Sequence, residues 1–437
     1  MKKQLLLTLL FTSIMVLNAQ EVIYEEYNLD NGLHVILHQD NTAPIVVTSI
    51  AYHVGAKDEN PERTGFAHFF EHLLFEGTKN IGRGEWDKIV SSKGGMNNAT
   101  TNDDRTYYYE VFPSNALETG LWLESERLLH PVIEQVGVDT QNEVVKEEKR
   151  LRVDNQPYGN LLAEIKKNLF KEHPYRWSTI GSMDHLDAAT LEEFQAFNKK
   201  FYIPNNGTLI IAGDFEKEKT KKMIQDYFGP IPKGEVFEKN FPKEKPITQE
   251  YKATAYDSNI QIPAIIACYR TPSFKTREAR VLDMISTYLS DGNSSKLYKK
   301  LVDDKKMALA VQAVNLSQED YGIYALFSLP LGETTLDNLL TEMDEEITKL
   351  QSELISEKDH QKLLNQFENQ FVNANATLEG IASSLATYHV LYGDTSLINT
   401  EIELYRSITR EEIMEVAKKY LGSNQRLLME YLPVENQ

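Results

Sequence analysis

The chain has 437 residues, of which 41% are hydrophobic and 25% charged, and its formal net charge is -19. This length exceeds the size at which one hydrophobic core stops growing, so two domains are expected. The composition excludes a disordered or collagen-like chain, and a mean hydropathy of -0.43 excludes a polytopic membrane protein. The acidic charge argues against nucleic acid and anionic membranes as partners.

The first predicted element is a secretory signal peptide, residues 1–19. Lys2 and Lys3 precede an apolar stretch from Leu5 to Leu17, and Ala19 offers the cleavage site. The stretch is shorter than the roughly 20 residues of a membrane span, so an uncleaved anchor helix is the weaker alternative. We therefore expect export across the inner membrane to the periplasm, with no membrane span left after cleavage.

Strands and then helices follow in residues 20–230, the predicted N-terminal domain. The alternating run "LHVILHQ" follows an Asp-Asn-Gly turn, and "PIVVTSIAYHVG" is a longer apolar run. Helical patterns come after these strands instead of alternating with them. This order favours an α+β fold, with a sheet covered by helices, over a βαβ repeat.

The segment "HFFEHLLFEGT", residues 68–78, predicts a metal site on a helix. Positions i and i+4 share one helix face, so His68 and His72 can bind one ion, and Glu71 flanks the same face. Two histidines with a third ligand suit Zn²⁺ and leave a position for water, which a carboxylate can deprotonate. The alternative, two core histidines, would bury three polar groups in an apolar helix at a cost of several kcal/mol.

A carboxylate is the expected third ligand, and it lies in the segment that begins at Asp139. The candidates are Glu143, Glu147 and Glu148. Glu147 and Glu148 point about 100° apart on a helix, so only one of them can face the metal. Periodicity alone leaves the choice open.

The second half of the chain is predicted to duplicate the first. Residues 231–248 form a proline-rich predicted linker, and residues 249–437 form the C-terminal domain. The segments that begin at Leu191 and Arg410 align with a constant offset of 219 residues, and each is an amphipathic helix, a turn and an apolar strand. Cys268, the single cysteine, lies in a predicted buried strand and is expected to pack as a small hydrophobic side chain.

Several of these motifs together resemble the pitrilysin/insulinase-type, or inverted zincin, zinc peptidases. They are "TGFAHFFEHLLFEGT", "GGMNNATTNDDRTYYYE", "EVVKEEKR", "HPYRWSTIG" and "FYIPNNGTLIIAGDF", in the family's order and across nearly the whole mature chain. The resemblance implies two duplicated α+β domains, each with an antiparallel-rich sheet packed with helices. Together they would form half of a clamshell, with the metal site only in the first domain.

The resemblance also implies roles for individual residues. His68, His72 and Glu148, which lies 76 positions after His72, would hold one Zn²⁺ ion, and Glu71 would act as general base on the zinc-bound water. Asn98 and Ala99 would lie on a strand beside the metal and contact the peptide substrate. An extended peptide can add to such a sheet edge through backbone hydrogen bonds.

Two departures from the family pattern limit what can be carried over. Many members have a glutamate seven residues before the distal ligand, where this chain has Gln141. Self-sufficient members bind substrate with an Arg and a Tyr in the second half, where this chain has Val302 and Leu309. This pattern predicts a heterodimer with a homologous subunit that lacks zinc and supplies the Arg and Tyr. A homodimer or a monomer that binds substrate through other residues is the alternative.

The sequence therefore predicts a zinc-dependent endopeptidase that hydrolyses peptides or unfolded polypeptides as the catalytic subunit of a heterodimer. One alternative is a peptidase that processes a dedicated precursor, which would have the same zinc site. Another is a non-catalytic peptide-binding or scaffold subunit. That alternative predicts a broken ligand set, whereas His68, Glu71 and His72 are all present.

Overall fold

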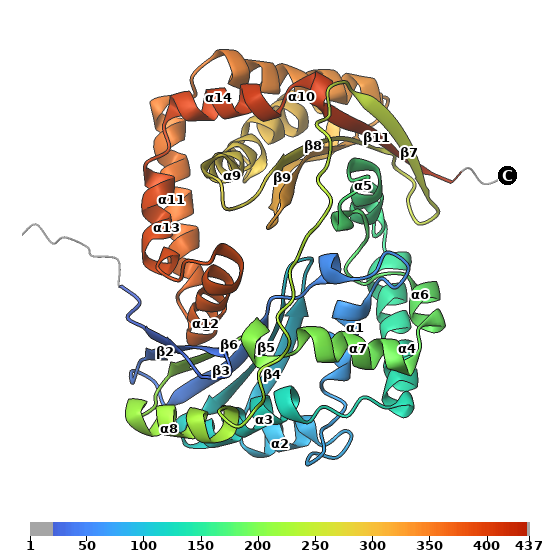
Figure 1. Ribbon diagram of the computed structural model, residues 1–437. Helices are drawn as coiled ribbons and strands as arrows, with labels where there is room; N and C mark the ends of the chain where they lie inside the picture. Colours follow the sequence, from blue (N-terminus) through green and yellow to red (C-terminus); the bar gives the residue numbers. More distant parts are fainter. Residues whose placement is uncertain (1–20, 435–437) are drawn as a thin grey trace, which may run out of the picture.

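The computed structural model describes residues 21–434 and contains two β-sheets, each backed by helices (Figure 1). The predicted signal peptide, residues 1–19, lies outside the described residues. Sheet 1 has six strands in the order β1-β2-β6-β3-β5-β4. These strands are β1 (Glu25–Asn28), β2 (His34–Gln39), β3 (Ile45–Tyr52), β4 (Met96–Thr101), β5 (Thr106–Pro113) and β6 (Gly207–Gly213).

Sheet 2 belongs to the second half of the chain and has five strands in the order β7-β11-β8-β10-β9. These strands are β7 (Tyr251–Asp257), β8 (Ala264–Pro272), β9 (Ala308–Ser317), β10 (Tyr321–Pro330) and β11 (Arg426–Pro433). Most neighbouring strands in both sheets are antiparallel, and the exceptions are the parallel pairs β2–β6 and β7–β11.

Apart from the edge strand β1, the two sheets have the same topology, which confirms the predicted duplication. In sheet 1, β6 lies between parallel β2 and antiparallel β3, and in sheet 2, β11 lies between parallel β7 and antiparallel β8. The offset of 219 residues relates β6 to β11 and the preceding helix α7 (Leu191–Phe201) to α14 (Arg410–Tyr420). Thr190 and Thr409 cap these two helices with the same reciprocal capping box.

Helices cover the outer face of each sheet. Residues of β3 alternate between two cores, because successive side chains of a strand point to opposite faces. One core packs sheet 1 against helices of the first half, and the corresponding core packs sheet 2 against helices of the second half. The remaining helices of the first half are α1 (Phe66–Leu73), α2 (Trp86–Ser92), α3 (Leu117–Leu129), α4 (Gln135–Lys149), α5 (Leu161–Leu169), α6 (Met183–Ala188) and α8 (Lys217–Phe228). Those of the second half are α9 (Arg277–Ser290), α10 (Leu336–Ser352), α11 (Glu357–Ala374), α12 (Leu378–Thr387) and α13 (Leu397–Arg406).

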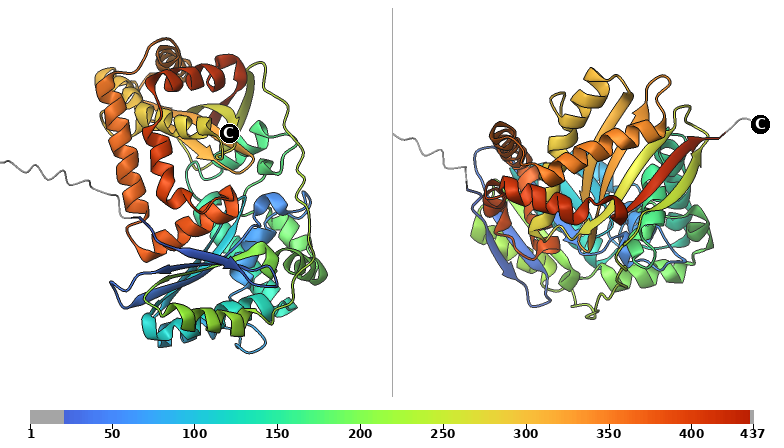
Figure 2. Two further views of the ribbon diagram at one scale, coloured as in Figure 1. Left: turned by 60° about the vertical axis from the view of Figure 1, so that its left-hand side comes forward. Right: turned by 90° about the horizontal axis from the view of Figure 1, so that it is seen from above.

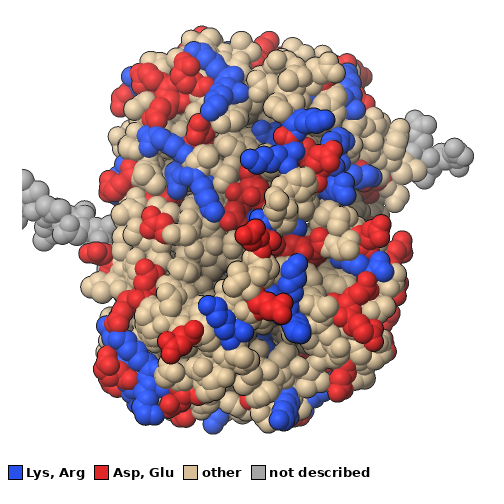
Figure 3. Space-filling model, viewed as in Figure 1, with Lys and Arg blue, Asp and Glu red and all other residues tan. Residues whose placement is uncertain are grey.

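The two halves cross over to cover the inner faces of the sheets. Ala382, Leu385 and Ala386 of α12 pack on sheet 1, whereas Ile165 and Leu169 of α5 pack on sheet 2. Figures 1 and 2 show this exchange, with α12 reaching down to the strands of the first half. Each half therefore completes a hydrophobic core of the other. The space-filling view is hollowed left of its centre, between the two halves (Figure 3).

The segment between α8 and β7 has no helix or strand, as the predicted linker requires, but it is held in place. Lys239 donates to the backbone oxygen of His53 at 2.6 Å and to Asp58 Oδ2 at 2.9 Å. The Glu244 carboxylate accepts three consecutive backbone N–H groups, those of residues 171–173. The linker limits of residues 231 and 248 stay a prediction. None of the helices in residues 21–434 is long and apolar enough to cross a bilayer.

A buried charge cluster locks the β9–β10 turn of the second half into the first half. The Lys57 side chain is 2% exposed, and its Nζ lies 2.7 Å from Glu319 Oε2 and 2.9 Å from both Asp104 Oδ1 and Asp320 Oδ2. His53 Nε2 lies 2.7 Å from the same Glu319 oxygen. Burial alone would raise the pKa of Glu319, but His53 and Lys57 outweigh it and hold that pKa well below its usual range. The carboxylate therefore stabilises the joined halves in its ionised form.

Replacing Glu319 with Gln is expected to lower the free energy of unfolding by about 1.5–3 kcal/mol at pH 7, because it weakens the hydrogen bonds to buried Lys57 and half-buried His53. The folded pKa lies below the unfolded value of 4.5, so this contribution is complete above pH 4.5 and is lost as the pH falls further. Urea unfolding at pH 7 and at lower pH measures the difference, with exposed Glu333→Gln as control. If the two variants lost the same free energy of unfolding at pH 7, Glu319 would not stabilise the contact between the two halves.

Candidate metal centre

Helix α1 begins at a position that only glycine fits well. Gly65 has a φ of +100°, and a Cβ there would lie 2.8 Å from the Ile180 backbone oxygen. The buried Glu59 carboxylate accepts the N–H groups of Gly65 at 2.8 Å and Ala67 at 2.9 Å. These contacts satisfy two of the free N–H groups at the helix start. Burial raises the pKa of Glu59 well above the usual glutamate value, although the two N–H groups oppose the shift.

The two faces of α1 have different chemistry. One face packs into the first core, and its buried side chains are Phe66, Phe69, Phe70 and Leu73. The Tyr108 hydroxyl of β5 donates to the Phe70 backbone oxygen at 2.7 Å and ties the helix to the sheet. The opposite face carries His68, Glu71 and His72. Because the apolar face can pack in only one orientation, it fixes the direction in which the two imidazoles point.

Helix α4 brings Glu148 to these imidazoles. Glu148 Oε2 lies 3.1 Å from His72 Nε2 and 3.6 Å from His68 Nε2, and the centroids of the two rings are 4.9 Å apart. The other carboxylate oxygen, Oε1, lies 2.7 Å from Arg152 Nη1. The structure thus brings together the three residues to which the resemblance assigned the zinc.

The two alternative carboxylates point away from the histidines. Glu147 is 50% exposed and pairs with Arg150. Glu143 is 77% exposed and lies 3.3 Å from Lys146 Nζ. Both match a solvated helix face, so Glu148 alone among the three candidates has the position of a ligand.

The donor set suits a zinc ion. Both Nε2 atoms face the carboxylate, and the buried His68 Nδ1 has no hydrogen-bond partner among the described residues. Burial and the neighbouring His72 lower the pKa of His68 to about 4, which keeps its lone pair free at neutral pH. The hydrogen bond from His72 lowers the pKa of Glu148 and keeps it ionised. Two imidazole nitrogens and one carboxylate oxygen are typical of zinc sites that keep a fourth position open.

Glu71 lies on the same face of α1, between the two histidines in sequence, and it does not belong to the converging trio. Burial raises its pKa above the ordinary glutamate value, although the nearby Thr101 hydroxyl and His72 oppose the shift. A carboxyl group with a raised pKa is better suited to accept and return a proton near neutral pH.

The strand that carries Asn98 and Ala99 forms an open edge of sheet 1. β4 pairs only with β5, and its first and last residues are Met96 and Thr101. The Ala99 N–H donates to the side-chain Oδ1 of Asn98 at 2.9 Å, so it is turned away from β5. Asn98 is exposed, whereas Ala99 is buried. The strand therefore offers a backbone edge that the Asn98 side chain partly covers.

Gln141 has a structural partner that explains the departure from the family pattern. Its Nε2 donates to Glu76 Oε1 at 2.5 Å, and Arg83 pairs with the other Glu76 oxygen. A glutamate at position 141 would place two carboxylates in contact. The supporting residues Glu59, Glu76 and Arg152 were not predicted from the sequence. Only Arg152 had a signal there, its spacing of four residues from Glu148.

A second group of potential ligands, Glu26, His34 and His389, is a poorer metal site. The two imidazole rings are stacked with centroids 3.6 Å apart and an interplanar angle of 5°. An ion must lie close to the plane of each ligating ring, and two parallel planes cannot share it. Glu26 Oε2 accepts instead from the Thr395 hydroxyl at 2.8 Å and lies 3.2 Å from His34 Nε2. This group joins the two halves.

The positions at which a substrate-binding Arg and Tyr were expected carry apolar side chains. Val302 packs against the second core, and Leu309 lies on β9, one of the two edge strands of sheet 2, where it is 51% exposed. Neither side chain can donate a hydrogen bond.

Family models identify both halves of the chain. Residues 34–182 match Insulinase (Peptidase family M16), and residues 188–367 match the Peptidase M16 inactive domain. The chain belongs to peptidase family M16. This membership confirms the metallopeptidase expected from the segment with His68, Glu71 and His72, and it confirms the fold of two related α+β domains.

Individual relatives match this M16 chain over most of its length. The zinc protease PqqE of Helicobacter pylori is 27% identical over 407 residues, which cover 92% of this chain and 91% of the relative. The crystal structure of a protease from Helicobacter pylori has a TM-score of 0.87 at 26% identity and covers 94% of this chain and 99% of that one. The periplasmic protease PqqL of Escherichia coli shares the fold at a TM-score of 0.77 and 19% identity, but the match covers 94% of this chain and 48% of PqqL.

Replacing Glu148 with Gln is expected to weaken zinc binding by more than about 100-fold, because it removes a charged ligand. Loss of a residue that only hydrogen-bonds to a ligand costs about 10–100-fold. Zinc content after dialysis against a weak chelator measures the loss. Glu147→Gln is the matched control, since its side chain points away from the histidines. Full zinc retention in Glu148→Gln would exclude Glu148 as a ligand.

Proposed function

We propose that this M16 chain is a zinc-dependent endopeptidase that hydrolyses peptides or unfolded polypeptides, with one Zn²⁺ held by His68, His72 and Glu148. The observation that carries the proposal is the convergence of these three side chains from α1 and α4, with Glu71 beside them on α1. The zinc protease name of the Helicobacter pylori relative supports it.

Glu71 acts as the general base in this proposal. When bound, Zn²⁺ supplies Lewis acidity, which polarises a peptide carbonyl and acidifies water in the site. Glu71 accepts the proton from the attacking water and then gives it to the leaving amine. Its raised pKa supports both steps, because the carboxylate is basic enough to take the proton and acidic enough to release it. Arg152 holds Glu148 in place through its second oxygen.

The substrate backbone lies along the open edge of β4 in this proposal. The outward N–H of Ala99 donates to a peptide carbonyl once the Asn98 side chain swings aside, and the Asn98 amide then contacts the substrate. Main-chain hydrogen bonds of this kind hold any extended sequence. They favour unfolded polypeptides over folded proteins, because a folded chain has few free backbone groups to offer.

A second subunit completes the active enzyme in this proposal. Val302 and Leu309 leave the second half without polar groups at the expected substrate-binding positions. The match to PqqL spans 48% of that longer chain, which supports a second two-domain unit beside this one. A homologous chain without the zinc residues would supply the Arg and Tyr, and a homodimer is the alternative. We place this assembly in the periplasm, because residues 1–19 have the pattern of a signal peptide.

Replacing Glu71 with Gln is expected to lower kcat by about 100- to 10,000-fold, because it removes the proton acceptor. Zinc content should stay unchanged, since Glu71 lies outside the converging trio. Cleavage of a quenched-fluorescent peptide mixture by the zinc-loaded chain together with its partner subunit measures the rate, and exposed Glu62→Gln is the control. Wild-type turnover in Glu71→Gln would remove Glu71 from the base role.

Zinc-loaded chain on its own is expected to cleave the same mixture slowly or not at all, because the substrate-binding Arg and Tyr come from the partner. Adding a candidate homologous subunit that lacks the zinc motif should restore turnover and give a heterodimer by light scattering. Full, chelator-sensitive activity of the isolated chain would contradict the two-subunit proposal and leave the zinc peptidase proposal intact.

A further inference from the structure

The second half keeps the architecture of the metal centre without its ligands. The offset of 219 residues that relates β3 to β8 and β6 to β11 also makes α1 overlap the C-terminal end of α9 and α4 overlap α11. It relates His68 to Thr287, His72 to Asp291 and Glu148 to Phe367. The three donors are thus replaced by a hydroxyl, a carboxylate and an aromatic ring, a set that no longer suits zinc.

A cavity of about 420 Å³ lies at this corresponding place, and both Thr287 and Phe367 line it. Its walls come from α9, α11, α13 and the π-helical turn Tyr388–Tyr392. The volume is sufficient for a side chain or a small ligand.

Aromatic rings form much of the cavity wall. Phe367 and Tyr405 are stacked with centroids 4.6 Å apart, and Tyr388 and Tyr392 meet edge to face at 5.4 Å. All four rings line the cavity. Aromatic faces carry partial negative charge and attract cations placed over them.

The cavity also contains a carboxylate without a cationic partner of its own. Asp283 accepts from Asn315 Nδ2 and from the Tyr405 hydroxyl, each at 2.8 Å, and both of these donors are neutral. The nearby cation, Arg280, donates to the Glu401 carboxylate at 2.7 and 2.9 Å. The charges of Arg280 and Glu401 therefore neutralise each other. The lining therefore has a net negative charge.

Burial raises the pKa of Asp283 to about 6, against the opposing hydrogen bonds from Asn315 and Tyr405. At pH 7 the Asp283 carboxylate is still ionised in most molecules. Because it is partly desolvated, it would attract a cation more strongly than an exposed carboxylate does. The net charge of -19 on the whole chain adds a field that attracts cations to the molecule.

We propose that this cavity binds a guanidinium or ammonium group, with Asp283 as its counter-ion and the rings of Tyr388, Tyr392 and Tyr405 around it. The ligand class is an arginine or lysine side chain of a polypeptide, or a free polyamine, since the two share this cationic group. The duplicated half thus keeps a binding site where the first half has its metal centre.

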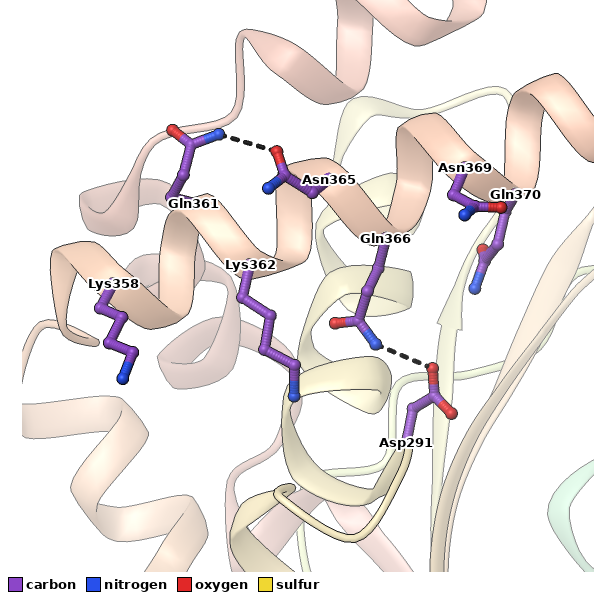
Figure 4. Close-up of a pocket in the computed structure, with 8 residues that line it drawn as sticks. All are labelled: Asp291, Lys358, Gln361, Lys362, Asn365, Gln366, Asn369 and Gln370. Carbon is purple, nitrogen blue, oxygen red and sulfur yellow. Dashed lines mark hydrogen bonds between the residues drawn. The ribbon is translucent and has the colours of Figure 1, made fainter.

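A neighbouring groove on α11 lacks these features (Figure 4). Its lining has no aromatic ring, and its polar groups pair with one another, as Gln361 does with Asn365 at 3.0 Å and Gln366 with Asp291 at 3.2 Å. Lys358 and Lys362 add positive charge there. A cation should therefore prefer the Asp283 cavity. Asp291, the residue that follows α9, offers a control carboxylate outside that cavity.

The test is calorimetric titration of the full chain carrying Glu71→Gln with N-acetyl-arginine amide and with its neutral isostere, N-acetyl-citrulline amide. We expect saturable binding of the arginine probe at one site and none of the citrulline probe. Asp283→Asn should weaken the binding by about tenfold or more, because it removes the counter-ion. Asp291→Asn should leave it unchanged. The titration measures binding and not peptide hydrolysis. Its result therefore tests the cation site independently of the proposed peptidase activity.

Tyr392→Leu is a second variant, because it leaves the hydrogen bonds of Asp283 intact while removing one ring. It should weaken binding about fivefold, and circular dichroism verifies folding of each variant. A ten-residue peptide with one arginine and free spermidine distinguish the two ligand sources by their relative affinity. Equal binding of the arginine and citrulline probes, or full affinity in both Asp283→Asn and Tyr392→Leu, would overturn the proposal.

Discussion

The contact between the Glu148 carboxylate and the two imidazoles of α1 is the constraint on which the first half depends. It requires two helices, whose residues His72 and Glu148 are 76 positions apart in the sequence, to hold Glu148 Oε2 at 3.1 Å from His72 Nε2 and 3.6 Å from His68 Nε2. Glu59 fixes the start of α1, its apolar face fixes the rotation, and the Gln141–Glu76 hydrogen bond fixes α4 against it. Such support from outside the ligand set is what makes a metal site preorganised.

The duplicated half shows that the scaffold and the chemistry are separable. Sheet 2 repeats the strand order of sheet 1 without β1, and α9, α10 and α14 cover it as helices of the first half cover sheet 1. These helices are needed to bury the sheet whatever their exposed faces carry, so the ligands could be replaced without loss of the fold. Two cavity residues show that the ligands could be replaced. Phe367 stands at the position of Glu148, and Asp283 lies one helical turn before Thr287.

Local patterns predicted much of this structure, and long-range contacts account for what they missed. The spacing of His68 and His72 placed both on one helix face, and the repeat at Leu191 and Arg410 predicted the duplication, because each depends on neighbours in sequence. The choice of Glu148 over Glu147 depends on where α4 packs. An amphipathic pattern says that a helix face is buried, but not that α12 packs on sheet 1. From the sequence alone, Lys57 would be expected at the surface. It is buried because the β9–β10 turn of the other half packs over it.

The most direct measurement of the central claim is anomalous X-ray scattering above and below the zinc edge from crystals of the metal-loaded chain. The account predicts one zinc peak per chain, at roughly 2.0–2.2 Å from His68 Nε2, His72 Nε2 and a Glu148 carboxylate oxygen. A fully loaded crystal with no peak at these residues, or with its peak at Glu26, His34 and His389, would contradict it.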